Sequence, residues 1–98
     1  MAAKKSKSKK LQFCNITMYQ KYGSLHNDRG PAYIDSHEQI VQYYRYGKLH
    51  RANGPAYINK KYGYHRWYLN GKQYEFSDWC KKTSLDKDSL AMLILTHD

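Results

Sequence analysis

Tyrosine and β-branched residues alternate with polar residues over most of the chain, from about Leu11 to Tyr74. All eleven tyrosines fall between Tyr19 and Tyr74, interleaved with isoleucine, valine and tryptophan and interrupted by glycines. Aromatic and β-branched residues are enriched in strands, and glycines between such runs mark turns. The pattern therefore predicts a mainly β protein whose strands are joined by short turns.

The β-type region repeats itself. Gly23, Gly47 and Gly71 are 24 residues apart (47 − 23 and 71 − 47), and residues 19–34 are identical to residues 43–58 at ten of sixteen positions. A third, truncated copy occupies residues 67–74. Self-similarity at a fixed period is typical of repeat proteins. We therefore expect one domain with tandem antiparallel β-hairpin repeats in a twisted sheet, with units near residues 18–41, 42–65 and 66–74.

Each unit contains two turn signals. In the second copy, residues 43–46 are expected to form a strand and Gly47-Lys48 a tight reversal. Residues 52–54 then form a second turn before a strand at residues 55–58.

Two other residue types fix the turns more closely. Asn70-Gly71 is a strong hairpin signal, because both residues tolerate the positive φ that a type I′ turn requires. Pro31 and Pro55 have no N–H for a ladder, so we expect them at the first position of a strand or on an edge.

Alternation along each strand separates two sets of aromatic residues. Successive side chains of a strand point to opposite faces of the sheet. We expect the equivalent residues Tyr19, Tyr43 and Trp67 to be buried, which leaves partly exposed tyrosines on the other face. We expect four smaller residues to pack around the buried rings: Ala32, Ile34, Ala56 and Ile58. The partly exposed tyrosines are Tyr44, Tyr57 and Tyr68.

After Tyr74 the sequence changes to a helical pattern. Ser77 is a good N-cap, and Asp78 in the first turn is favourable against the helix dipole. Residues 86–95 predict a second helix, because leucine and isoleucine recur there at helical spacing. Residues 75–98 are therefore interpreted as a cap of one or two short helices over the open end of the sheet.

The charge is unevenly distributed. The chain carries 17 basic and 8 acidic residues, a formal net charge of +9. Residues 1–10 contain only lysine, serine, alanine and the initial methionine, and we expect them to form a disordered basic arm. A basic arm and a basic repeat region favour an anionic partner. The arm lysines predicted to contact it are Lys4, Lys5, Lys7, Lys9 and Lys10. The repeat residues predicted to contact it are Tyr44, Arg45, Lys48, Arg51, Tyr57, Lys60, Lys61, Arg66 and Tyr68.

Little in the sequence indicates catalysis. Cys14 and Cys80 are too few and too far apart for a disulfide framework or a zinc site, so reduced thiols are expected. His26 and His50 recur beside arginines, but a residue repeated once per unit usually serves the turn of that unit, here the loops at residues 28–30 and 52–54. No nucleophile or carboxylate pair accompanies them in a hydrolase pattern. We expect no enzymatic activity, no metal and no cofactor.

The segment Gly-Lys-Leu-His-Arg-x-x-Gly-Pro-Ala at residues 47–56 resembles MORN-type repeats, which are short tandem β-hairpins. It is most similar to small phage-encoded proteins built of such units and ending in a Trp-containing helical tail. The first copy departs from this pattern at Ser24 and Asn27, and the third lacks the histidine and the Gly-Pro-Ala. The residues that carry the repeat architecture are Gly23, His26, Gly30, Pro31, Gly47, His50, Gly54, Pro55 and Gly71.

These observations favour a non-enzymatic binding module. The resemblance implies a phage-encoded protein in the host cytoplasm, docking on host machinery or a nucleoprotein complex and modulating or inhibiting it. The partner would present an acidic protein surface or a nucleoprotein complex. Two alternatives remain open: a nucleic-acid-binding accessory protein that uses the arm and the tyrosine-bearing face, and a virion or scaffold component. We expect no signal peptide, because the lysine run is not followed by an uninterrupted apolar stretch. No segment approaches a membrane-spanning length, so we expect no membrane association. We also expect no small-molecule substrate.

Overall fold

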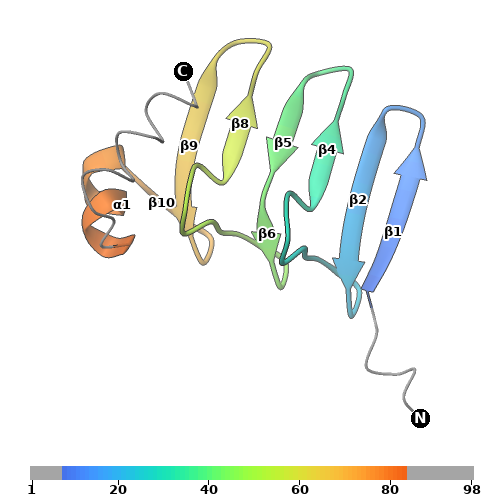
Figure 1. Cartoon of the computed structure of the whole chain (residues 1–98), viewed down its shortest axis with the longest axis horizontal. Coiled ribbons are helices and arrows are strands. Elements are labelled where there is room, and N and C mark those ends of the chain that lie inside the picture. Colours follow the sequence, from blue (N-terminus) through green and yellow to red (C-terminus); the bar gives the residue numbers. More distant parts are fainter. Residues whose placement is uncertain (1–7, 84–98) are drawn as a thin grey trace.

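The computed structural model describes residues 8–83 (Figure 1). Within this range ten strands are followed by one helix. In chain order they are β1 (Ser8–Phe13), β2 (Ile16–Lys21), β3 (Ser24–Leu25), β4 (Tyr33–Asp35), β5 (Ile40–Gln42), β6 (Tyr44–Arg45), β7 (Lys48–Leu49), β8 (Tyr57–Asn59), β9 (Tyr64–Leu69), β10 (Lys72–Tyr74) and α1 (Phe76–Thr83). The predicted second helix at residues 86–95 lies outside the described residues.

The strands form an antiparallel sheet with the order β1-β2-β4-β5-β8-β9-β10, and β3 pairs with β2. β6 and β7 form a separate two-stranded ladder. The strand pairs β1–β2, β4–β5 and β8–β9 lie side by side, and α1 packs beside β9 and β10 (Figure 1). The expectation of a mainly β fold followed by a C-terminal helix is confirmed.

The strand starts keep the sequence period. β2, β5 and β9 begin at Ile16, Ile40 and Tyr64, so equivalent strands are 24 residues apart, like the glycines of the sequence.

The tight turns lie one residue earlier than predicted in the second copy. Arg45 pairs with Lys48, so the two turn residues are Tyr46 and Gly47, and Lys48 already belongs to β7. Both turn residues have positive φ, 48° and 82°, as a type I′ turn requires. The turns at residues 22–23 and 70–71 also have two positive φ angles, 53° and 80° in the first and 51° and 85° in the second. Glycine at the second position tolerates this conformation without a Cβ penalty.

The predicted basic arm ended three residues too late. Ser8, Lys9 and Lys10 belong to β1, where they pair with Lys21, Gln20 and Tyr19. β2 is six residues long, so it offers ladder partners beyond Leu11, and lysines are well tolerated on an edge strand. Residues 1–7, which include Lys4, Lys5 and Lys7, lie outside the described residues.

The strand register separates two faces. The inner face carries Tyr19, Ala32, Ile34, Tyr43, Ala56, Ile58 and Trp67, as the pairings through Ile34, Val41, Ile58 and His65 show. Ala32, Ala56 and Ile58 are buried, as predicted. Ile34 and the three aromatic residues are only half-buried, because among the described residues α1 covers just the β9–β10 end of the sheet.

The opposite face, called here the tyrosine face, carries Tyr33, Tyr44, Tyr57, Tyr68 and Arg66. Tyr33 and Tyr57 both pair with Gln42, and Tyr57 also pairs with Arg66. All four tyrosines are half-buried. The separation of Tyr44, Tyr57 and Tyr68 from Tyr19, Tyr43 and Trp67 was correctly predicted from the alternation of side chains.

Pro31 and Pro55 lie two residues before β4 and β8 instead of at their first positions. Pro55 is fully buried. The alanine that follows each proline takes over the ladder contact: Ala32 N–H donates to the Gln42 carbonyl, and Ala56 N–H to the Arg66 carbonyl.

Helix α1 is anchored by Trp79, which is fully buried. Its ring lies 4.6 Å from that of Trp67, and its indole N–H donates to the Arg51 carbonyl at 3.0 Å. Phe76 also packs on Trp67, with 4.6 Å between ring centroids. The helix begins at Phe76, so Ser77 lies in the first turn and is not the N-cap as predicted. Asp78 lies in the first turn as expected.

Candidate functional site

Three clefts follow the 24-residue period along the sheet. Each is lined by one aromatic residue of the inner face: Tyr19 in the first, Tyr43 in the second and Trp67 in the third. Their volumes are about 370, 680 and 830 Å³. We call them the first, second and third clefts.

The second cleft gathers the greatest number of arginines. The loop after His26 lines one side with Arg29, and the second repeat lines the other side with Arg45, His50 and Arg51. Asp28 is its acidic residue. Arg29 and Arg45 are exposed, so their guanidinium groups are available to an anionic ligand. The excess of cations gives this cleft a positive potential that attracts anions.

Arg51 is held inside the fold. Its guanidinium carbon lies 3.9 Å from the centroid of the Tyr43 ring, Nε donates to Asn53 Oδ1 at 3.2 Å, and Nη1 donates to the Pro55 carbonyl at 3.2 Å. A Cβ on Gly54 would lie 2.6 Å from that carbon, so a larger residue at this position would displace the guanidinium. Burial lowers the pKa of the Arg51 guanidinium, which nevertheless stays charged. Arg51 therefore organises the loop as well as adding charge to the cleft.

The repeated histidines join each repeat to the next. His26 Nδ1 accepts the backbone N–H of Tyr46 at 2.9 Å, and His50 Nδ1 accepts that of Asn70 at 2.9 Å. The following turn glycines complete the pattern: Gly47 N–H donates to the Leu25 carbonyl and Gly71 N–H to the Leu49 carbonyl. Each Leu-His pair thus binds both N–H groups at the tip of the next hairpin.

Nδ1 of each histidine accepts a backbone N–H that lies outside the predicted loop, and only His26 contacts its own loop, through the side chain of Asp28. The loops at residues 28–30 and 52–54 were expected to receive the ring nitrogens. The accepted N–H groups instead belong to residues 20 positions further along the chain. Adjacent repeats place the hairpin tip of one beside the histidine of the other, a contact that local sequence does not reveal.

The two histidines differ in their remaining ring nitrogen. Nε2 of His26 lies 2.8 Å from Asp28 Oδ1, and the His26 ring lies 4.2 Å from the ring of Tyr46. His26 is buried, whereas His50 is half-buried. Burial, and secondarily the charge of Arg45, lowers the pKa of His50 below its ordinary value of 6.5. His50 is therefore neutral at pH 7, with the proton on Nε2 because Nδ1 is an acceptor.

The tyrosine face forms a second candidate surface. The Tyr44 hydroxyl donates to Gln42 Oε1 at 3.1 Å. Burial raises the pKa of Tyr44, with smaller contributions from Tyr33 and Tyr68. Arg66 lies 5.5 Å from the centroid of the Tyr64 ring. The face offers half-exposed aromatic rings and one guanidinium.

The remaining predicted contact residues do not join either surface. Lys48 lies at a hairpin tip, where it lines a further cleft of about 490 Å³ with Arg45, Tyr46, His50 and Asn70. Lys60 and Lys61 lie in the loop between β8 and β9, and Lys61 Nζ approaches Glu38 Oε1 at 3.6 Å. Lys9 and Lys10 line the first cleft. The predicted contact residues are thus divided between the two faces of the sheet, the hairpin tips and the β8–β9 loop.

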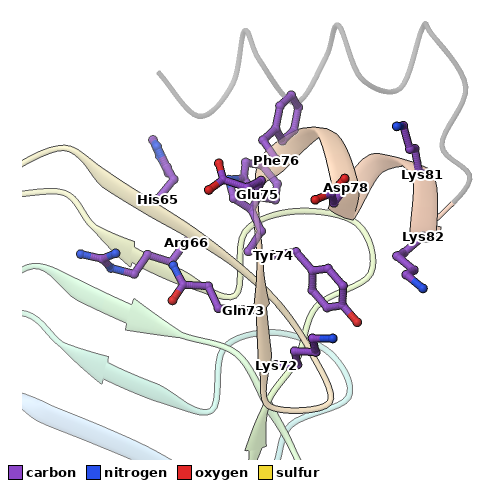
Figure 2. A pocket seen from close by; sticks show the side chains of 11 residues that line it. His65, Arg66, Lys72, Gln73, Tyr74, Glu75, Phe76, Asp78, Lys81 and Lys82 are labelled. Carbon is purple, nitrogen blue, oxygen red and sulfur yellow. The ribbon is translucent and has the colours of Figure 1, made fainter.

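Several cleft residues were not predicted as binding residues. Arg29 lines both the first and the second cleft. The sequence repeat could have indicated this, because stacked repeats bring the loop after His26 next to the second repeat. The third cleft lies between β9, β10 and α1, with Lys72 on β10 and Lys81 and Lys82 on the helix (Figure 2). Glu75 and Asp78 also line it, so its charge is mixed.

The described residues contain no group of three or more His, Cys, Asp or Glu side chains arranged to hold a metal ion. No helix within residues 8–83 is long and apolar enough to cross a membrane. Comparisons with protein-family models, with curated proteins and with solved structures found no match for this chain.

Proposed function

We propose that this chain is a non-enzymatic binding module of MORN-like repeats, phage-encoded and active in the host cytoplasm, that docks on an acidic protein surface of host machinery and modulates it. One observation carries the proposal: the second cleft places the exposed Arg29 and Arg45 beside His50 and Arg51, with Asp28 as the acidic residue. Arginine is enriched at protein interfaces and binds carboxylates through planar, paired hydrogen bonds.

The state of the nucleophilic and basic side chains supports binding over catalysis. His26 uses both ring nitrogens within the fold, and His50 uses Nδ1 for a backbone N–H. Burial raises the pKa of the Cys80 thiol, which keeps it protonated and weakly nucleophilic. Both histidines thus hold neighbouring repeats together through Nδ1, and Cys80 stays a thiol.

Charge-matched variants test the proposal. Arg45 in the second cleft and Lys60 in the β8–β9 loop are both exposed, so Arg45→Glu and Lys60→Glu change the net charge equally at different places. With a glutamate-rich peptide as probe, we expect Arg45→Glu to bind at least about tenfold more weakly and Lys60→Glu within about twofold of the parent. Equal losses would show that net charge, and not the cleft, determines binding.

A second function is favoured by the tyrosine face, which carries Tyr33, Tyr44, Tyr57, Tyr68 and Arg66. Unpaired bases stack on exposed aromatic rings in single-strand binding proteins. A single-stranded oligonucleotide distinguishes this alternative, because its affinity falls steeply with salt, whereas a protein interface weakens mildly. Tight, strongly salt-dependent binding that is lost in Arg66→Gln and unchanged in Arg45→Glu would favour nucleic acid over acidic protein. Affinity purification from the host, with and without nuclease, would identify the natural partner.

A further inference from the structure

The second repeat contains a position that the first repeat fills with its own carboxylate. In the first repeat, Asp28 Oδ1 lies 2.8 Å from His26 Nε2. The equivalent pair in the second repeat is His50 and Ala52, which has no carboxylate. The second repeat therefore keeps the histidine but lacks the acid that its counterpart contacts.

His50 has a hydrogen to donate at this position. Its Nδ1 accepts the Asn70 N–H at 2.9 Å, so in the neutral ring the proton resides on Nε2. Within residues 8–83, no hydrogen-bond acceptor contacts this Nε2. The tyrosine ring that covers His26 is also missing, because Asn70 occupies the position equivalent to Tyr46. The donor of His50 is accessible where that of His26 is occupied and buried.

The surroundings of His50 are positively charged. It lines the second cleft and the smaller hairpin-tip cleft. The titratable and charged groups lining these two clefts are Asp28, Arg29, Tyr43, Arg45, Tyr46, Lys48 and Arg51. Asp28, the acid among them, already contacts His26, so an incoming anion meets four cations and an N–H donor.

We propose that the second cleft binds an acidic side chain of the protein partner, with its carboxylate accepting the Nε2 hydrogen of His50 beside Arg45 where Asp28 stands in the first repeat. This inference rests on the proposed function, because it names the group of the acidic partner that enters the cleft. A carboxylate fits because the first repeat already holds one in the equivalent place. The hydrogen bond is charge-assisted and is correspondingly strong.

An isosteric pair of variants tests the site without a partner. Ala52→Asp supplies an internal carboxylate to His50, as Asp28 does to His26, and Ala52→Asn supplies the same shape without charge. A nearby carboxylate favours the protonated ring, so the pKa of His50 measured by NMR titration should be higher in Ala52→Asp than in Ala52→Asn. The His26 resonances serve as an internal control for an intact fold. Identical His50 titrations in the two variants would overturn the proposed site.

The same variants test partner binding with a glutamate-rich peptide and its glutamine counterpart. Ala52→Asp occupies the site, so the glutamate peptide should bind at least about tenfold more weakly than to Ala52→Asn, the loss expected for one charge-assisted hydrogen bond. Equal binding to both variants would overturn the inference and leave the proposed function standing. If the parent binds no glutamate peptide while Ala52→Asp still raises the pKa of His50, the site accepts a carboxylate and the proposed function fails.

Discussion

Replacing the two repeated histidines by alanine should destabilise the fold by different amounts. His26→Ala removes the acceptor of the Tyr46 N–H, the contact with Asp28 and the ring packing against Tyr46. The His26–Tyr46 hydrogen bond is part-buried and His26 is only 5% exposed, so water replaces the lost acceptor less readily here than at His50. An unsatisfied buried donor costs about 1–3 kcal/mol, and a lost neutral hydrogen bond about 0.5–1.5 kcal/mol. We expect a total loss of about 2–4 kcal/mol in unfolding free energy.

His50→Ala should cost less. Its bond to Asn70 lies in an exposed part of the structure, so water replaces the lost acceptor. The expected loss is about 0.5–1.5 kcal/mol. For a domain of this size, 1 kcal/mol shifts Tm by about 4–8 °C, so the two variants should be clearly separated in thermal or urea unfolding.

His37→Ala is the matched control, because His37 is exposed and only approaches Glu38 at 3.7 Å. It should remain within about 0.5 kcal/mol of the parent. Amide hydrogen exchange adds a local measurement: in His26→Ala the amides of Tyr46 and Gly47 should exchange faster than in the parent. If His26→Ala and His50→Ala lose equal stability, or if these amides keep their protection, the proposed link between repeats is wrong.

Three further perturbations address the turn, the cap and the charge state. Gly71→Val should lose about 1–3 kcal/mol in urea unfolding, because a β-branched residue is strained at a φ of 85°; an unchanged midpoint would contradict the turn. Trp79→Ala should lose about 3–5 kcal/mol, since it deletes a fully buried ring, and a melt matching the parent would show that α1 does not hold the sheet. The pKa of His50 is lowered below 6.5 in the folded protein, so the unfolded chain binds this proton more readily and the unfolding free energy should fall as pH drops below about 6.5. The fall should be smaller in His50→Gln. Equal falls in the parent and in His50→Gln would contradict the assignment of this pH dependence to His50.

The turns and faces were predictable from sequence because their causes are local. A glycine after a residue that tolerates positive φ identifies a type I′ turn within a few residues, and alternation within a strand separates Tyr43 from Tyr44. The one-residue error at Gly47 arose because Tyr46, an unusual residue for positive φ, takes the first turn position. Tertiary contacts with the preceding repeat stabilise it there.

The candidate site was less predictable, because its contacts cross repeats. Nothing near His50 in the sequence indicates that Asn70 will donate to it. From the sequence, Arg51 is expected to be an exposed cation. Only its packing between Tyr43 and Gly54 shows that it also organises a loop. Lys9 and Lys10 read as part of a charged arm, yet pairing with β2 places them in the sheet.

The surroundings of the three aromatic residues of the inner face support the second repeat as the proposed binding position. The Lys10 ammonium lies 5.9 Å from the Tyr19 centroid, and the neighbouring His26 is already occupied by Asp28. Trp67 is covered by the rings of Phe76 and Trp79, so the third position serves the cap. Tyr43 alone among the three is stacked with an arginine and lies beside a histidine whose Nε2 meets no acceptor within residues 8–83. The second repeat has Arg51, Ala52 and Asn70 where the first has Asn27, Asp28 and Tyr46. These differences make the second position more cationic and leave Nε2 of His50 without an internal acceptor within residues 8–83.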